Sequence, residues 1–400
     1  MGAVLGWAIY LAVSWTWCIG MFLPILLLRD FGPLGYIAFA VPNVLGAAAM
    51  GWIITSPEAS RRFVQRHRAA CVTFSLITAF FHFAFVLAVI YPLESLNQGM
   101  LATSVVLLVP LALSWLDRPR ATALIIYAIS VGVISTFIAR GWIPAPDADP
   151  LAAEMLRSFR QPAAAALMLA PACVFGFLLC PYLDLTFHRA RQNLTGTESP
   201  LAFGIGFAIF FLAMILFTIA YAPVFTPRLE KSSTLLNQTL LLALLVHLAA
   251  QSTATIAFHL RALHQPTTGP WGRFVAMFLA SVAVIALGWL AVWRPGIAGP
   301  PALSDEHQKL VWYRIFMSFY GLVFPGYVWL LSIPTRDGHA GPRGPRGRKK
   351  LRVLVLAVAL AAPCFWLGFV ERETWWLLPG MAVMLGSRIL ITPRTHRRVL

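Results

Sequence analysis

The sequence predicts an all-α polytopic membrane protein, and three observations support this fold class. First, 59% of its 400 residues are hydrophobic. Second, only 12% are charged, against about 25% in an ordinary soluble domain. Third, apolar runs of 18 or more residues recur from end to end, and as helices such runs are long enough to cross about 30 Å of hydrocarbon. No stretch between them is large enough to form a separate soluble domain.

Run length and hydropathy predict about 12 transmembrane helices. The predicted spans are residues 3–28, 32–55, 70–92, 100–116, 121–139, 163–188, 200–225, 236–260, 274–293, 309–332, 351–370 and 374–392. Residues 140–162 are predicted to form an external loop. Residues 333–350 are rich in Gly, Pro and Arg, which predicts a flexible basic linker. Residues 351–400 then hold two additional helices and a basic tail.

The distribution of Lys and Arg predicts the orientation of these spans. The connections that follow even-numbered spans, together with the tail, hold about twice as many basic residues as the opposite side. Basic residues concentrate on the cytoplasmic side, so both termini are expected in the cytoplasm and the protein in the cytoplasmic membrane.

The net charge of +16 does not indicate a nucleic-acid partner, because no basic stripe lies on a soluble fold. Instead we expect the segment 336–352 to be extended or disordered and to touch anionic membrane lipid through Arg346, Arg348, Lys349 and Lys350. Each basic residue near such a surface contributes about 1 kcal/mol.

Two apolar segments contain helix-breaking residues at corresponding places. Residues 15–24 read WTWCIGMFLP, with Gly20 and Pro24, and residues 172–181 read ACVFGFLLCP, with Gly176 and Pro181. Proline deletes a backbone donor, and broken helices at membrane depth persist only where they line a cavity or lie inside protein. A pair of interrupted helices in the two halves of a chain indicates the binding site of a transporter.

The order of the spans predicts an inverted repeat. Residues 1–139 and 163–332 each hold five predicted spans, and each set begins with its interrupted helix. Because five is odd, the second set crosses the membrane in the opposite sense to the first. This is the layout of inverted-topology repeats in secondary transporters.

The interrupted segments and one motif resemble the LeuT-fold transporters of the amino acid–polyamine–organocation superfamily, most closely the sodium:solute and nucleobase–cation symporters. The motif is LAAQSTATIAFHLRA, residues 248–262, in which Ala249, Ser252 and Thr253 share one helical face. The resemblance implies a sodium ion held by these three residues and by carbonyls near Trp17 and Gly20, with no other cofactor. The alternative is that the two hydroxyls bond back to carbonyls of their own helix.

The resemblance also implies a site for a small organic solute near the middle of the membrane. The residues expected to form it are Trp15, Trp17, Gly20, Ser75, Thr78, His82, Phe175, Gly176 and Phe177. For His82 a hydrogen bond between helices is the favoured alternative. Aromatic walls with few polar groups suit an uncharged or planar solute.

Three charged residues in or beside apolar spans are candidates for gating. Asp184 is interpreted either as an inner gate or protonation switch, or as a helix-end carboxylate paired with Arg189 or Arg191. Asp30 and Arg314 have the signs needed for an ion pair that closes the site from outside. The alternative is a charged stop at Asp30 with Arg314 reaching to the headgroups. In water-accessible surroundings such a pair would contribute about 0–1 kcal/mol.

These patterns predict a secondary active transporter, not an enzyme, that couples sodium to the movement of a small solute. No two carboxylates share an apolar span, and the histidines form no HxxxH box, so no catalytic residues are predicted. Two alternatives remain open. One is a proton-coupled carrier of the same fold, in which a lysine on the fifth helix often replaces sodium; residues 121–139 contain none. The other is a membrane sensor or structural protein that kept the fold and lost transport.

Overall fold

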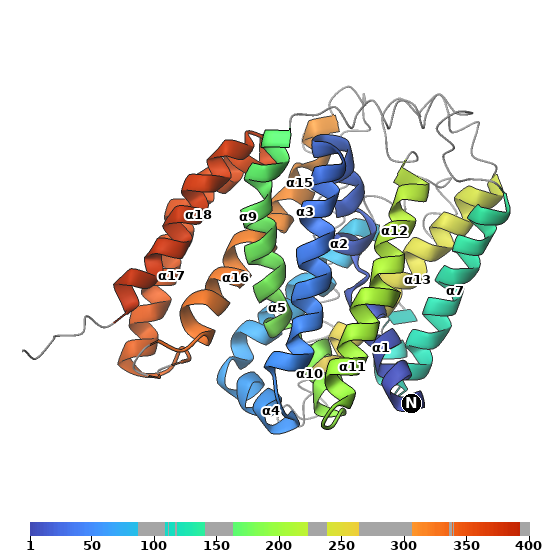
Figure 1. Ribbon diagram of the computed structural model, residues 1–400, viewed down its shortest axis with the longest axis horizontal. Helices are drawn as coiled ribbons and strands as arrows, with labels where there is room; N and C mark the ends of the chain where they lie inside the picture. The colour runs from blue at the N-terminus through green and yellow to red at the C-terminus, as the bar shows by residue number, and fades with distance from the viewer. Residues whose placement is uncertain are drawn as a thin grey trace, which may run out of the picture.

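The computed structural model describes residues 1–86, 109–110, 112–116, 118–140, 163–222, 238–263, 306–335, 338 and 340–392. All regular structure in these ranges is helical (Figure 1). Eight of the described helices are long and apolar enough to cross a membrane, and two further apolar helices are shorter. The prediction of an all-α polytopic membrane protein is therefore confirmed. The predicted span 274–293, most of 100–116, and the loop 140–162 beyond its first residue lie outside the described residues.

The first predicted span is interrupted, as expected. It is built from α1 (Gly2–Trp15), α2 (Cys18–Met21) and the start of α3 (Leu23–Ile53). Between α1 and α2, Trp17 is extended, with φ −97° and ψ −170°. Farther along, Gly32 interrupts α3 with φ 66° and ψ −164°, a conformation that residues with a Cβ rarely adopt. This kink falls at the predicted boundary between the first and second spans.

A polar surface helix then leads into the next spans. The elements are α4 (Pro57–Arg66), α5 (Arg68–Phe85) and α7 (Pro119–Ala139). The Ser56 hydroxyl accepts a hydrogen bond of 3.0 Å from the Ala59 N–H and so caps α4. In Figure 1 this helix lies at the lower end of the bundle, the end that also holds the N-terminus.

The second half contains several π-helical segments. Its elements are α9 (Ala163–Leu179), α10 (Leu185–Gln192), α11 (Glu198–Ile205), a π-helix Gly206–Phe211, α12 (Leu212–Tyr221), α13 (Gln238–Leu263), α15 (Glu306–Ser318), a π-helix Phe319–Val323, α16 (Phe324–Tyr327) and a π-helix Val328–Ser332. Two C-terminal helices follow: α17 (Gly344–Phe365) with a π-helix Trp366–Val370, and α18 (Leu377–Gly386) between short 3₁₀ turns. Segments of π-helix are frequent at functional sites.

The second interruption is real but lies later than predicted. Helix α9 runs without a break through Pro171 and Gly176 to Leu179. The chain then forms a 3₁₀ turn at Cys180–Leu183, with Pro181 in its first positions, and Asp184 is extended before α10 begins. Pro181 therefore marks the interruption, and the prediction that Gly176 marks it is wrong.

Gly176 instead allows two backbones to approach each other. A Cβ at this position would lie 2.5 Å from the carbonyl oxygen of Tyr320, and one at Gly46 would lie 2.1 Å from the carbonyl oxygen of Phe177. Small residues are used in this way at contacts between membrane helices. As a result α9 packs directly against α3 on one side and against the π-helix that follows α15 on the other.

The predicted linker is partly helical. Helix α17 begins at Gly344, so the basic residues 346–350 form its first two turns. Lys350 is only 3% exposed, and its Nζ donates to the Thr335 hydroxyl at 3.2 Å. Arg346, Arg348 and Lys349 remain exposed. The expectation of an extended or disordered segment over 336–352 is thus wrong for its helical part, because a glycine with φ 75° and the following proline start a helix there.

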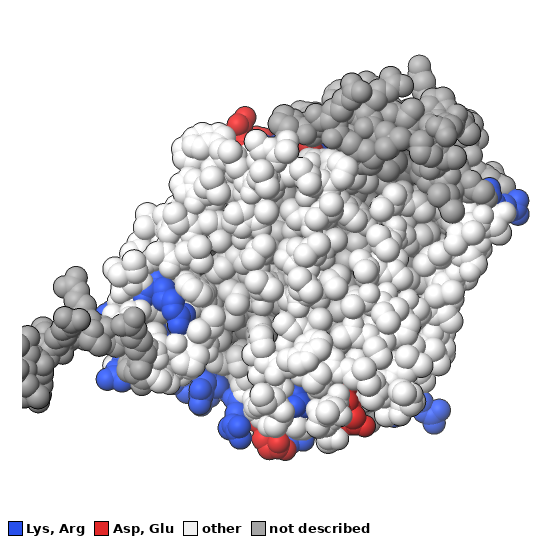
Figure 2. All heavy atoms as spheres, in the orientation of Figure 1, with Lys and Arg blue, Asp and Glu red and all other residues white. Residues whose placement is uncertain are grey.

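Charged residues lie toward the edges of the face shown in Figure 2. Figure 2 shows most of the visible Lys and Arg along the lower and left edges of the molecule, with another at the upper right edge, whereas the centre of this face shows no charged residue. An uncharged middle zone is what a lipid-facing surface requires.

Candidate functional site

The interruption of the first helix lies at Thr16 and Trp17. The Thr16 N–H donates to the Ala12 carbonyl oxygen at 2.9 Å and its hydroxyl donates to the same atom at 2.8 Å. Helix α1 ends at Trp15, Thr16 has the non-helical φ −80° and ψ 60°, and Trp17 is extended. The backbone of residues 16–18 is therefore not fully hydrogen-bonded within a helix, and each of its buried N–H groups without a helical partner needs one from elsewhere.

His82 of α5 supplies one of these partners. Its Nε2 accepts a hydrogen bond of 3.1 Å from the N–H of Cys18, the first residue of α2. Its Nδ1 lies 2.9 Å from the Thr78 carbonyl oxygen, to which it must donate. The two contacts together require the neutral ring with its proton on Nδ1. The favoured interpretation of His82, a hydrogen bond between helices, is confirmed.

Tyrosines from distant helices hold other polar groups near the interruption. The Tyr313 hydroxyl donates to the Cys18 carbonyl at 2.7 Å, and the Tyr221 hydroxyl donates to the Met21 carbonyl at 2.8 Å. Neither tyrosine was predicted from the sequence. A tyrosine within an apolar helix, whose hydroxyl needs a partner when buried, was the only available signal.

The indole of Trp17 fills the centre of the bundle. Its ring centroid lies 4.7 Å from that of Trp15 and 4.9 Å from that of Tyr320, with Phe74 at 6.0 Å. Trp15 is fixed in turn, because its Nε1 donates to the Asn43 side-chain oxygen at 2.6 Å. Of the predicted solute-site residues, Trp15, Trp17, Thr78 and His82 are therefore brought together.

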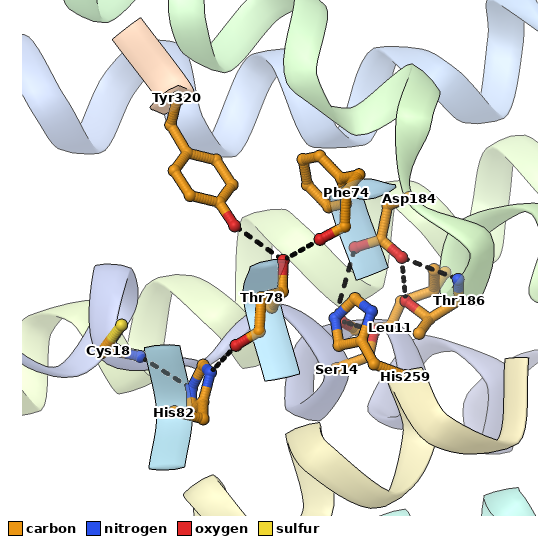
Figure 3. A network of polar contacts seen from close by, with 10 residues as sticks. All are labelled: Leu11, Ser14, Cys18, Phe74, Thr78, His82, Asp184, Thr186, His259 and Tyr320. Atoms are coloured by element: carbon orange, nitrogen blue, oxygen red, sulfur yellow. Dashed lines mark hydrogen bonds and ion pairs between the residues drawn. The ribbon is translucent and has the colours of Figure 1, made fainter. Parts of the chain in front are cut away.

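Thr78 links α5 to the π-helix that follows α15. Its hydroxyl donates to the Phe74 carbonyl at 2.9 Å. Since that proton is used, the hydroxyl accepts from the Tyr320 hydroxyl at 2.7 Å (Figure 3). Tyr320 also belongs to the ring cluster around Trp17, and the sequence analysis did not identify it.

The other predicted solute-site residues lie elsewhere. The ring of Phe175 contacts Trp329, and that of Phe177 contacts Phe39. Phe177 and Gly176 line a small apolar cavity of about 40 Å³ between α3, α9 and α15, which Ser318 also lines. The sequence placed these residues beside Trp17 because it placed the second interruption one turn too early. Ser75 is buried on α5, and its hydroxyl has no hydrogen-bond partner among the described residues.

The second interruption is organised by Asp184. Its Oδ1 accepts from the Thr186 N–H and from the Thr186 hydroxyl, both at 2.7 Å, and so caps α10. Asp184 is thus a helix-end carboxylate, but the alternative interpretation that it pairs with Arg189 or Arg191 is not met by Arg191, whose side chain donates to the carbonyl oxygens of Ile54 and Leu194.

The second carboxylate oxygen of Asp184 points toward α13. The Asp184 Oδ2 lies 4.0 Å from Nε2 of His259 (Figure 3), and both side chains are fully buried. Neither Oδ2 nor either ring nitrogen of His259 has a hydrogen-bond partner in the described part of the chain. The Trp17 Nε1 likewise lacks one there. Buried polar atoms without partners are uncommon, and here they belong to residues beside the two interruptions.

The predicted sodium ligands lie on α13, which packs against α5 and α7 and also contacts α1. Ser252 is fully buried and its hydroxyl has no partner among the described residues. The alternative, a bond from Ser252 to its own helix, is therefore not formed. Thr253 is buried and Ala249 is partly buried. Gly20, the predicted backbone ligand, lies within the single turn of α2 and faces the ring of Phe211.

The predicted outer ion pair is formed. Arg314 of α15 donates through Nη2 to Asp30 Oδ2 and through Nη1 to the Phe369 carbonyl at 3.1 Å. Asp30 Oδ1 accepts from Arg29 Nε at 3.0 Å, and Arg372 Nη1 lies 3.7 Å from the same oxygen. The Asp30 and Arg314 side chains are each only 3% exposed. The pair is therefore buried, and the expected water-accessible surroundings are wrong.

A second polar contact joins the opposite end of the bundle. Nε2 of His188 on α10 donates to the Tyr182 carbonyl at 2.9 Å, which leaves its Nδ1 as an acceptor. The Ser60 hydroxyl of α4 lies 2.8 Å from this Nδ1 and therefore donates to it. Gln192 in turn donates to the Ser60 hydroxyl oxygen at 3.1 Å. The surface helix α4 is thus bonded to the helix that follows the second interruption.

No protein-family model, curated protein or solved structure matches this chain.

Proposed function

We propose that this protein is a secondary active transporter that couples sodium to the movement of a small organic solute across the cytoplasmic membrane by alternating access. The observation that carries the proposal is the meeting of two interrupted helices. Trp15, the last residue of α1, has its ring centroid 4.9 Å from that of Phe187 in α10. Interrupted helices of this kind form ion and solute sites in transporters.

An exchange of packing partners supports an inverted repeat. Helix α1 packs against α7 and α11, whereas α9 packs against α16 and α3. Exchange the first predicted span with the sixth, the second with the seventh and the fifth with the tenth. The contact between α1 and α7 then becomes the contact between α9 and α16, and the contact between α1 and α11 becomes the contact between α9 and α3. With the third span exchanged with the eighth, the contact between α5 and α13 maps onto itself. Such a pattern is expected from two halves related by a two-fold axis in the membrane plane.

The distribution of charge supports an orientation. The end that holds the N-terminus and α4 carries the Lys and Arg clusters (Figure 2), so the positive-inside rule puts it in the cytoplasm. The exposed Arg346, Arg348 and Lys349 at the start of α17 then face the anionic lipid of the inner leaflet. The Asp30–Arg314 pair lies at the outer end of the pathway and the Ser60–His188 contact at the inner end.

The sodium site is tested with purified protein in detergent. If Ser252 and Thr253 bind sodium, the melting temperature rises with sodium concentration, because a ligand that binds only the folded state stabilises it by about 2.7 kcal/mol at 100 times its dissociation constant. Choline at equal ionic strength is the reference salt. The double substitution Ser252→Ala with Thr253→Ala should abolish the sodium-dependent rise. Thr218→Ala, which removes a buried hydroxyl that bonds to its own helix on α12, should retain it.

A screen of small uncharged and planar solutes in proteoliposomes then tests transport itself. Uptake that depends on an inward sodium gradient, and is lost in the double variant, is the expected result. If the double variant keeps the full response to sodium, the ion does not bind at these residues. If no tested solute moves under any ion gradient while sodium still stabilises the protein, the chain binds ions without transporting these solutes.

A further inference from the structure

Asp184 and His259 form a buried ionisable pair outside the predicted sodium ligands. One carboxylate oxygen caps α10, as described above, and the other faces His259 Nε2 at 4.0 Å. Both side chains have no exposed surface. The distance is too long for a hydrogen bond and short enough that a movement of about 1 Å would make one.

No basic side chain of Lys or Arg lies within 4 Å of Asp184 among the described residues, where His259 is its only ion-pair partner. The titratable groups that interact with the pair come from four elements: Tyr10 on α1, Cys71 and His82 on α5, Tyr320 on the π-helix after α15, and, through Tyr10, Arg189 on α10. The tyrosine and cysteine groups are uncharged at neutral pH. His82 is neutral in its observed hydrogen bonds. The surroundings therefore supply no close positive charge to balance an ionised Asp184.

One bound proton would neutralise the pair and allow Asp184 and His259 to form a hydrogen bond with each other. A carboxylate buried without a counter-ion is strongly disfavoured, and a neutral histidine carries one N–H that also needs an acceptor. With one proton shared between them, the pair becomes either a neutral carboxylic acid that donates to the imidazole or an imidazolium beside a carboxylate. Both arrangements have no net charge, whereas the unprotonated pair would bury an uncompensated negative charge even if the imidazole donated to the carboxylate. The proton then belongs to the pair, not to one residue.

We propose that Asp184 and His259 bind one proton while the bundle is closed, and release it to water when the inner end opens. Asp184 lies in the second interruption and caps α10, so a movement of α10 that opens the inner end also brings the carboxylate into contact with water. The proton is taken up from water on one side and returned to water on the other, and no other reactant is consumed. This inference rests on the proposed transport function and names a second coupling ion for it.

Infrared spectroscopy of the wild-type protein tests the bound proton without a substitution. As the pH of purified protein is raised from 6 to 9, the carbonyl band of a protonated carboxylic acid should disappear if the carboxylic-acid form is populated. Thermal unfolding detects the bound proton whether it lies on the carboxylic acid or on the imidazolium. Above about pH 6.5 the unfolded chain releases this proton and the folded protein keeps it, so the melting temperature should fall as the pH rises.

Single substitutions test whether Asp184 and His259 cause the infrared band and the fall in melting temperature. Asp184→Asn cannot ionise at this position, so both the infrared band and its share of the fall in melting temperature should be lost. His259→Gln should shift the pH of the change. His247→Gln, which alters another buried histidine of α13 that bonds to Ser130, should keep the infrared band and the fall in melting temperature above about pH 6.5. If Asp184→Asn melts with the wild-type pH dependence, the proposal is wrong.

Sodium and transport give separable outcomes. If sodium at pH 8 stabilises the wild type and this effect is lost in Asp184→Asn, the pair binds sodium and not a proton, which overturns the proposal. If the protonation signal is present and lost in Asp184→Asn while no solute moves in proteoliposomes, the proton site stands and the proposed transport function fails. If solute uptake proceeds equally with and without a proton gradient in the wild type, proton coupling is refuted and transport stands.

Discussion

Asp30 is the residue whose replacement tests the proposed outer gate most directly. Its carboxylate accepts from Arg29 at 3.0 Å and from Arg314, and Arg372 lies within 3.7 Å. Asp30→Asn preserves the size and shape of the side chain. It removes the negative charge and leaves three arginines next to one another.

The structure sets the expected size of this effect. Removing one partner of a buried ion pair costs about 3–5 kcal/mol, because the other charge stays buried without compensation. Arg314 is 3% exposed and retains only its bond to the Phe369 carbonyl, whereas Arg29 and Arg372 are 17% and 47% exposed and can be solvated. We therefore expect Asp30→Asn to lower the free energy of unfolding by about 3 kcal/mol. Arg314→Met should cost about half as much, because Asp30 keeps its two other arginines.

Denaturant or thermal unfolding in detergent, with both single variants and the double variant, measures the coupling. Glu58→Gln is the matched control, since it breaks an exposed carboxylate–arginine contact of 3.1 Å on α4, and it should not change stability. A cysteine placed at Ser318, whose hydroxyl bonds to the Arg314 carbonyl at 3.1 Å, should react faster with an external thiol reagent in the Asp30→Asn background. If Asp30→Asn behaves like Glu58→Gln in both assays, the pair neither stabilises nor closes this end.

Three further predictions concern the helix contacts and the histidines. Gly46→Ala places a Cβ against a backbone carbonyl of α9 and should cost about 1–3 kcal/mol or more, whereas Gly132→Ala, with open space around it, should not destabilise; thermal unfolding compares the two. His82→Phe leaves the Cys18 N–H without its acceptor, and the same assay should show a loss of about 1–3 kcal/mol; full retention would mean that water replaces the imidazole. Burial lowers the pKa of His67, between α4 and α5, to about 4, so the unfolded chain takes up a proton first, and stability should fall as the pH drops from about 6.5 toward 4. His67→Phe should flatten that part of the unfolding profile, and an unchanged profile would assign the loss to other groups.

The sequence predicted the fold class, the first interruption and the outer ion pair, each from a signal with a physical cause. The first interruption was predicted from Gly20 and Pro24, whereas the structure has α1 end at Trp15 and Trp17 extended, with Gly20 inside α2 and Pro24 in the first turn of α3. Asp30 and Arg314 have opposite signs at the same predicted depth. Their burial could not be predicted, because it depends on residues that follow α17.

The second interruption was misplaced because glycine has two uses in a membrane helix. It can weaken a helix, or it can let another backbone approach, and the sequence does not distinguish them. Gly176 has the second role, since its contact is the Tyr320 carbonyl on a helix more than 100 residues away. Pro181, by contrast, lies at the start of the 3₁₀ turn and marks the place where the helix ends.

The tyrosines and His259 were missed for a related reason. Tyr221, Tyr313 and Tyr320 satisfy groups of α2 and α5 from far along the chain, and no local pattern marks them. His259 does lie seven residues after Ser252, on the same face of α13. A search for polar residues along that face, and not only for the three expected sodium ligands, would have identified it.

Both ends of the proposed pathway are closed at once in this structure. The Asp30–Arg314 pair joins α3 to α15 at one end, and the Ser60–His188 contact joins α4 to α10 at the other. Between them Trp17 occupies the centre of the bundle. The apolar cavity nearby, at about 40 Å³, is far smaller than the roughly 300–1,000 Å³ of a typical ligand site.

A solute could therefore reach the centre only if one of these two contacts breaks and Trp17 moves. Trp17 is well placed for this, because it lies between α1 and α2, where no continuous helix restrains it. The Cys18 N–H is bonded to His82 and the Cys18 carbonyl to Tyr313, so a movement of Trp17 would be transmitted to α5 and α15 directly. Since α15 also carries Arg314, the interruption and the outer ion pair are mechanically connected through a single helix. An alternating-access cycle requires such a connection between the site and its gate.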